Sequence, residues 1–164
     1  MADTLTETKT VTPLDVLEKE MFRHPQVDCP LVHRFTDGMY IREIFMPAGT
    51  LVTTLVHKTN HPFVLTKGKL SVWNNGEVEH LEAPHVGITQ PGTRRVIIIH
   101  EDATWITFHA TDLTDPDEIA ETICDTRANP MLDENERLRC MWRKDQRGEI
   151  ERPEDVYKLM EAAA

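Results

Sequence analysis

Two histidines and an arginine in the middle of the chain have the types and spacing to build a binding site. His57 ends a run rich in β-branched residues, His61 follows across a short bend, and Arg95 follows a Pro-Gly turn. Side chains alternate between the faces of a strand, so His57 can point into the interior of a folded sheet. We expect two imidazoles and one guanidinium to converge on one cavity. The alternatives are a hydrogen-bonded core histidine at His57 and a rim histidine at His61.

These residue types support two different chemistries. A neutral imidazole binds zinc, iron or nickel well, and it can also hydrogen-bond a ligand without a metal. A guanidinium is always protonated, so Arg95 cannot ligate a cation and would repel one nearby. It would instead bind a carboxylate or phosphate through a fork of donors. The alternative for Arg95 is an ion pair with Glu43, Glu101 or Asp102.

Two further histidines and two tryptophans fall late in the predicted strands. His100 or His109 could supply another metal ligand, but His100 comes at a strand end, where exposure to solvent is expected, and His109 shares a face with Trp105. Trp73 and Trp105 could stack on a base or sugar, a contact worth about 1–3 kcal/mol with a nucleobase, or could belong to the core. Arg94 should point away from the cavity, and we expect it to have a solvated surface role.

The composition restricts the classes of partner. A formal net charge of −10 and a pI near 5.2 argue against general binding to nucleic acid or to an anionic membrane. Three cysteines without paired spacing indicate reduced thiols. The first residues form no apolar leader, and the longest aliphatic run, Val96–Ile99, is too short to cross a bilayer. We expect a soluble cytoplasmic protein.

Short β-branched and aromatic runs, separated by turns rich in proline and glycine, are typical of a compact all-β barrel. Asn-Asn-Gly at residues 74–76 is a strong hairpin signal because Asn and Gly tolerate positive φ. Strands are predicted around Val32–Phe35, Tyr40–Met46, Leu51–His57, Phe63–Thr66, Leu70–Trp73, Val78–Leu81, Val86–Gln90, Val96–His100 and Trp105–Ala110.

Helices are predicted at both ends of this strand region. Thr12, Pro13 and Asp15 combine a hydroxyl cap, an early proline and an acidic residue three positions after the cap. The same signature recurs at Asp115–Glu118, and a last short helix begins at Pro153. The expected organisation is a flexible N-terminus over residues 1–11, a leading helix and barrel over 12–111, and a helical extension over 112–164 that packs on the barrel or a dimer partner.

The glycine and turn spacing of residues 39–109 resembles the cupin superfamily, small β-barrels with two signature stretches. In the first signature, two histidines and a glutamate precede a glycine. With Gly68 as that glycine, His57 takes the place of the second histidine, His61 that of the glutamate and Leu55 that of the first histidine. The resemblance therefore implies a site in which only His57 keeps a standard metal ligand.

The second signature, Pro-x-Gly-x-x-His, matches at Pro91 and Gly92 and puts Arg95 at its histidine. More narrowly, Met46–Thr50 and His100–Asp102 look like a group of cupin-like proteins from tailed phages, most of them without an assigned function. The resemblance implies an all-β fold, a single cupin-like β-barrel (jelly roll) with an N-terminal helix and a C-terminal helical extension.

Two functions remain open, and the first is a non-catalytic binder that needs no cofactor. Arg95 and the histidines would hold the phosphate or carboxylate of a small, nucleotide-like anion, while Trp105 or Trp73 stacks on its ring. The substitutions in the metal positions favour this function. Its sharpest form is a phage sponge that sequesters a nucleotide signal of a host immune pathway, in the host cytoplasm.

The second function is a metal-dependent enzyme, an oxygenase or isomerase. His57, His61 and His109 would hold Fe, Zn, Ni or Mn, with an open position for substrate or water. We expect a homodimer, because isologous pairs are the commonest assembly and a partner shields sheet edges.

Overall fold

The computed structural model describes residues 9–23, 26–74, 76–137 and 142–144, and these are mostly β-strand. Three helices accompany the strands in the described ranges: α1 (Pro13–Met21), α2 (Pro116–Ile123) and α3 (Glu134–Arg137). The strands are β1 (Leu31–Thr36), β2 (Met39–Met46), β3 (Thr50–Thr53), β4 (Val56–His57), β5 (His61–Asn74), β6 (Glu77–Glu82), β7 (His85–Thr89), β8 (Val96–Ala110), β9 (Cys124–Asp125) and β10 (Trp142–Lys144).

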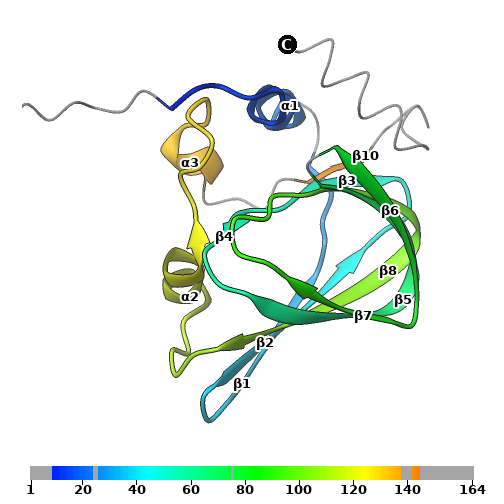
Figure 1. The fold of residues 1–164 in the computed structure, drawn as a ribbon, viewed down its shortest axis with the longest axis vertical. Helices are drawn as coiled ribbons and strands as arrows, with labels where there is room; N and C mark the ends of the chain where they lie inside the picture. The colour runs from blue at the N-terminus through cyan, green and yellow to red at the C-terminus, as the bar shows by residue number, and fades with distance from the viewer. Residues whose placement is uncertain (1–8, 24–25, 75, 138–141, 145–164) are drawn as a thin grey trace, which may run out of the picture.

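Eight of these strands form one antiparallel sheet, and β4 pairs with β9 in a separate ribbon. The sheet runs β1-β2-β8-β3-β10, while β5 pairs with β6, β7 and β8. Figure 1 shows the strands curving around a common interior. The pairings of the described residues do not close this sheet on itself, so the closed barrel stays a prediction.

Two long strands each replace a predicted pair of shorter ones. Residues 63–73 lie within β5 and residues 96–110 within β8. Gly68 lies in β5 where the register of this strand with β8 shifts. Its φ is +95°, and an added Cβ would lie 2.5 Å from the carbonyl oxygen of Asp102, so only glycine fits this close crossing. Conversely, the predicted strand Leu51–His57 is interrupted after Thr53 and resumes as β4.

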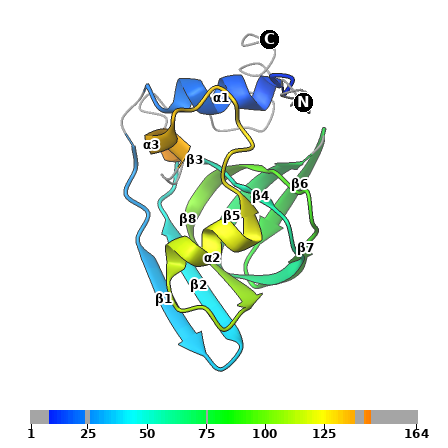
Figure 2. The ribbon, with the colours of Figure 1, turned by 90° about the vertical axis from the view of Figure 1, so that its left-hand side faces the viewer.

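Helix α1 begins as predicted, because its start signal is local. The Thr12 side chain accepts a hydrogen bond from the Asp15 amide, and the Asp15 carboxylate accepts one from the Thr12 amide. The apolar side of the helix packs on a buried cluster of the sheet that includes Leu51, Val96 and Ile98. In Figure 2, α1 lies across the upper end of the strands.

The expectation that Arg94 is a solvated surface residue is wrong. Its guanidinium forms ion pairs with Asp15, at 2.7 Å, and with Glu18 on α1. The two carboxylate side chains are 2% and 1% exposed, and the arginine side chain is 15% exposed. Asn129 also donates a hydrogen bond to Glu18. This cluster links α1 to the segment directly before β8, which also carries Arg95.

Helix α2 lies against the interior of the curved sheet. Asp115 caps its start, accepting hydrogen bonds from the Asp117 and Glu118 amides. Ile119 and Ile123 are buried in a cluster with Tyr40 and Cys124. The helix predicted from Pro153 lies outside the described residues. In the part of the chain that the structure describes, no helix is long and apolar enough to span a membrane.

Candidate functional site

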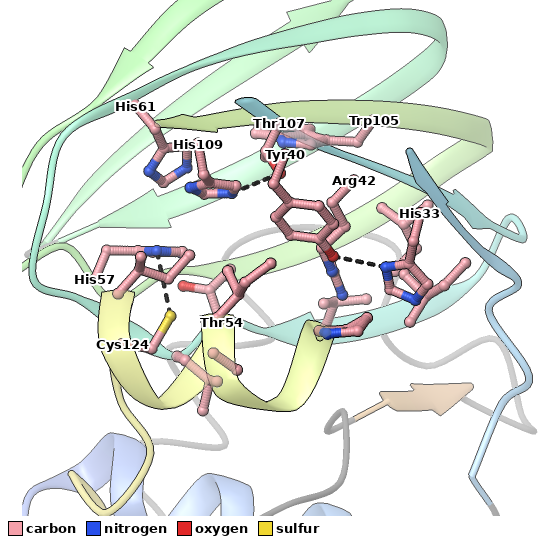
Figure 3. Close-up of a pocket in the computed structure, with 18 of the residues that line it drawn as sticks. His33, Tyr40, Arg42, Thr54, His57, His61, Trp105, Thr107, His109 and Cys124 are labelled. Atoms are coloured by element: carbon pink, nitrogen blue, oxygen red, sulfur yellow. Dashed lines mark hydrogen bonds between the residues drawn. The ribbon is translucent and has the colours of Figure 1, made fainter. Parts of the chain in front are cut away.

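A cavity of about 370 Å³ lies between the inner face of the sheet and α2. Strand alternation aims every second side chain of β2 and β8 into it, and the register places Tyr40 opposite His109 and Arg42 opposite Thr107. Figure 3 shows these side chains facing α2 across the cavity. The β4–β9 ribbon supplies His57 from the far wall.

Three histidines meet at one end of this cavity. The ring centroid of His61 lies 4.4 Å from that of His57 and 4.3 Å from that of His109, and the His57 and His109 centroids are 6.2 Å apart. His57 on β4 and His61 on β5 are close in sequence, whereas His109 comes from the distant strand β8. The structure therefore brings together the three residues predicted as metal ligands under the enzyme alternative.

All three imidazoles are held in the neutral form. Burial is the largest cause in each case: it lowers the pKa of His57 and of His109 to about 3, and that of His61 to about 4. Charge repulsion from His61 also lowers the pKa of His57 and of His109, and Arg95 acts in the same direction on His57 and His61. A ligand at neutral pH meets imidazoles that offer one donor and one acceptor each.

The neighbours of the histidines are weakly polar. Cys124 Sγ lies 3.5 Å from His57 Nδ1, and burial raises the pKa of the thiol to about 11. The cysteine therefore stays protonated and is a poor nucleophile. His109 Nε2 lies 3.0 Å from the Thr107 hydroxyl. Nδ1 of His109 is buried and has no hydrogen-bond partner among the described residues.

The three imidazoles are chemically suited to a transition metal, but their positions are not. Three neutral imidazoles are suitable ligands for zinc, iron or nickel. Within the described ranges, however, no three histidine, cysteine or acidic side chains are placed so that they could hold a metal ion together. The charge of Arg95 also opposes a cation beside His57 and His61.

Arg95 lines the cavity and rests on two aromatic rings. Its guanidinium carbon lies 5.3 Å from the ring centroid of Phe63 and 5.9 Å from that of Trp105. The two rings stack on each other at 4.2 Å. Cation–π contacts of this kind hold a guanidinium without neutralising its charge. Burial lowers its pKa, although the guanidinium stays protonated at any physiological pH.

The predicted ion-pair alternative for Arg95 is wrong. Glu101 pairs with Lys69 at 3.2 Å, Asp102 accepts a hydrogen bond from a backbone amide, and Glu43 pairs with another arginine on the outer face. No carboxylate among the described residues forms an ion pair or hydrogen bond with the Arg95 guanidinium. Its hydrogen-bond donors therefore remain available to a ligand.

Arg42 is a cavity residue that the sequence analysis missed. It lies on β2 between His33 and Thr107 in the strand register, and its charge helps to lower the pKa of His57 and of His109. The strand pattern could have indicated this position, because Arg42 is two residues from Tyr40, and residues two apart on a strand share a face. Among the described residues that line the cavity, two are arginines and only Asp117 is acidic.

Of the two tryptophans and the histidines His100 and His109, one of each lies in the cavity and one lies outside it. Trp105 and His109 line the cavity, as expected for the ligand-binding set. Trp73 does not: it packs against the buried cluster beneath α1. His100 is exposed and lies 2.6 Å from the Ser71 hydroxyl on the outer side of the sheet, as expected for a strand-end position.

The three histidines should make the fold sensitive to acid. In the unfolded chain their pKa returns to about 6.5, so between pH 6.5 and about 3 the unfolded chain binds more protons than the folded one. Their contribution is complete above pH 6.5 and is lost as the pH falls through this window. We expect the urea midpoint to fall with pH, and to fall less steeply in His57→Gln. Equal pH slopes for the two proteins would contradict the burial of a neutral imidazole.

No protein-family model and no curated protein matches the chain. Solved structures with a similar backbone include the cupin domain of Schizosaccharomyces pombe Cnp3, which is 22% identical, with a TM-score of 0.43 over 52% of this chain and 69% of that chain. A cupin-2 domain protein from Shewanella frigidimarina has 10% identity and a TM-score of 0.43, over 58% of this chain and 91% of that chain. Salicylate 1,2-dioxygenase from Pseudaminobacter salicylatoxidans has 15% identity and a TM-score of 0.45, over 58% of this chain and 30% of that chain. Two of these proteins are described as cupins and the third as a dioxygenase, so the likeness favours neither an enzyme nor a binder.

Proposed function

We propose that the chain binds a small anionic, nucleotide-like molecule in the cavity and does not transform it. One observation carries this proposal: Arg95 is partly buried on two aromatic rings, and no carboxylate of the described residues forms an ion pair or hydrogen bond with its guanidinium, on which Glu79 acts only through its charge. Phosphate or carboxylate oxygens match the fork of donors that the guanidinium presents. Arg42 adds a second positive charge to the lining of the cavity, although the net charge of the whole chain is −10.

The size and lining of the cavity support a small ligand with a ring. Small-molecule sites usually measure about 300–1,000 Å³, so a volume of about 370 Å³ suits a ligand of mononucleotide size or smaller. Trp105 and Tyr40 provide aromatic wall surface, and the neutral histidines provide hydrogen-bond donors and acceptors. A base or sugar would pack against these rings while its anionic group meets Arg95.

In its sharpest form the proposal is a sponge that sequesters a nucleotide signal. The resemblance of the turn and ligand positions to cupin-like proteins of tailed phages motivates this form, with a host immune pathway as the source of the nucleotide and the host cytoplasm as the location. A sponge needs affinity and burial, but no nucleophile. A protonated thiol at Cys124 and an incomplete metal arrangement are compatible with that requirement.

A metal-dependent enzyme is the second candidate, and the clustering of His57, His61 and His109 favours it. Iron, zinc, nickel or manganese held by these imidazoles would supply Lewis-acid or redox chemistry. The candidate requires the rings to reorient, because the described side chains do not present three donors to one point. Arg95 would then bind the carboxylate of a substrate rather than a sequestered signal.

Ligand and metal content together distinguish the two candidates. For the binder, we expect the purified protein to contain no stoichiometric metal and its melting temperature to rise with a mononucleotide, because a ligand of the native state stabilises by mass action. Differential scanning fluorimetry and elemental analysis make these measurements. Stoichiometric metal that is lost in His57→Ala, but kept in a control variant His100→Ala on the outer face, would contradict the binder.

A further inference from the structure

The sheet carries apolar side chains on both of its faces. An antiparallel sheet with one face in water usually alternates apolar inward and polar outward residues. Five neighbouring strands, in the order β7-β5-β8-β2-β1, depart from this pattern on the side away from the cavity. Their outward side chains form two apolar rows that cross the strands.

The first row contains four apolar residues in direct register. Val86 on β7 lies opposite Val64 on β5, which in turn lies opposite Ile106 on β8. The row continues through Glu43 on β2 to Val32 on β1. Val86 is 70% exposed and Val32 is 44% exposed, so both ends of the row are open to solvent.

The second row lies two residues further along the strands. Ile88 on β7 is opposite Pro62 on β5, and Phe108 on β8 is opposite Ile41 on β2. Arg34 on β1 ends this row, opposite Ile41. Ile88 is 61% exposed. We call the outward side chains of these two rows the outer apolar face.

The described helices leave the outer apolar face open. Helix α1 packs on the stretch of sheet around Leu51 and Ile98, and α2 packs near Tyr40 on the cavity side. In Figure 1 all three helices lie at the left and top of the molecule, while β7 and β5 lie at the lower right. The edge strands β1 and β7 each pair with one neighbour in the described part of the chain.

The charge on this face indicates what covers it. Its two charged residues, Arg34 and Glu43, form an ion pair with each other, so the face has no net charge. The whole chain carries −10, and two such chains repel each other wherever their acidic surfaces meet. A neutral apolar sheet is the surface on which two copies can approach, and the same face of a second copy matches it in both respects.

We propose that the outer apolar face is the contact between two copies of this chain, packed sheet against sheet around a twofold axis. Sheets that pack face to face interleave their apolar side chains at a spacing of about 10 Å. A twofold contact uses the same patch on both copies, which requires a self-complementary surface without a net charge. The contact would also shelter the edge strands β1 and β7 from other chains.

Sedimentation equilibrium tests this assignment on the full chain. We expect the wild type to have twice the 18.9 kDa mass of one chain, and a double variant Val86→Glu/Ile88→Glu to have the mass of a single chain. Both residues are exposed, so the near-ultraviolet circular dichroism of the variant should match the wild type. Val32→Glu, at the other end of the first row, tests the same face independently of β7.

Matched controls place glutamate at exposed apolar residues elsewhere. Val11 is 50% exposed and Leu113 is 37% exposed, and neither lies on the outer apolar face. Val11→Glu and Leu113→Glu should keep the mass of two chains. A single-chain mass for the wild type would overturn the proposal, and so would a two-chain mass that survives both the double variant and Val32→Glu. Because these measurements involve no ligand, their outcome is independent of the function proposed for the cavity.

Discussion

Replacing Arg94 with methionine is expected to lower the free energy of unfolding by about 3–5 kcal/mol. The change removes the one cation of a cluster in which Asp15 and Glu18 are almost fully buried. Both carboxylates would then lie at the interface between α1 and the sheet without their counter-charge. The cost of burying unpaired charge is much larger than the contact energy of an exposed ion pair. Urea denaturation monitored by fluorescence measures the difference.

The control for Arg94→Met removes an exposed ion pair at the C-terminal end of α1. Arg23 pairs with Glu20, and its side chain is 69% exposed, so Arg23→Met should cost no more than about 1 kcal/mol. Adding Asp15→Asn and Glu18→Gln to Arg94→Met should recover part of the lost stability, because it removes the unpaired charges. If Arg94→Met costs no more than Arg23→Met, the buried cluster does not stabilise the fold.

The local elements of the fold could be predicted because their signals lie within a few residues. The cap at Thr12 and the cap at Asp115 each depend on contacts two or three residues away, and both form as predicted. The role of Arg94 could not be predicted, since its partners are 76 and 79 residues away. The break between β3 and β4 has the same origin, because β4 pairs with β9 rather than continuing beside β8.

The candidate site divides in a similar way. Period-two alternation was enough to direct His109 toward the cavity, and the same argument applied to β2 would have found Arg42. His57 also lines the cavity, but it does so from the separate β4–β9 ribbon, because the strand from which its direction was predicted breaks after Thr53. Alternation could not separate Trp73 from Trp105, because both belong to strands that are buried on two sides. The difference appears only in the packing: α1 covers the strand face that carries Trp73, whereas Trp105 lines the cavity.

Replacing Arg95 with alanine is expected to weaken the binding of a mononucleotide by roughly ten- to a hundredfold. The change removes a charge-assisted fork worth about 1.5–3 kcal/mol. Folding should survive, because the cation–π contacts with Phe63 and Trp105 are modest and no carboxylate among the described residues forms an ion pair with Arg95. Isothermal titration calorimetry with the nucleotide identified by thermal shift measures the affinity. Arg34→Ala, which removes the same side chain from the outer face of β1, should leave that affinity unchanged.

Two further substitutions at this position test the chemistry of the arginine rather than its presence. Arg95→Lys should restore affinity only in part, because an ammonium keeps the charge but lacks the planar two-point geometry. Arg95→His would raise the metal content of the purified protein if the cavity is a metal site short of one ligand, and would leave it unchanged if the cavity binds an anion. If Arg95→Ala leaves every ligand affinity unchanged and sharply lowers the melting temperature, the arginine is a structural partner of the aromatic pair. The proposed anion site would then be wrong.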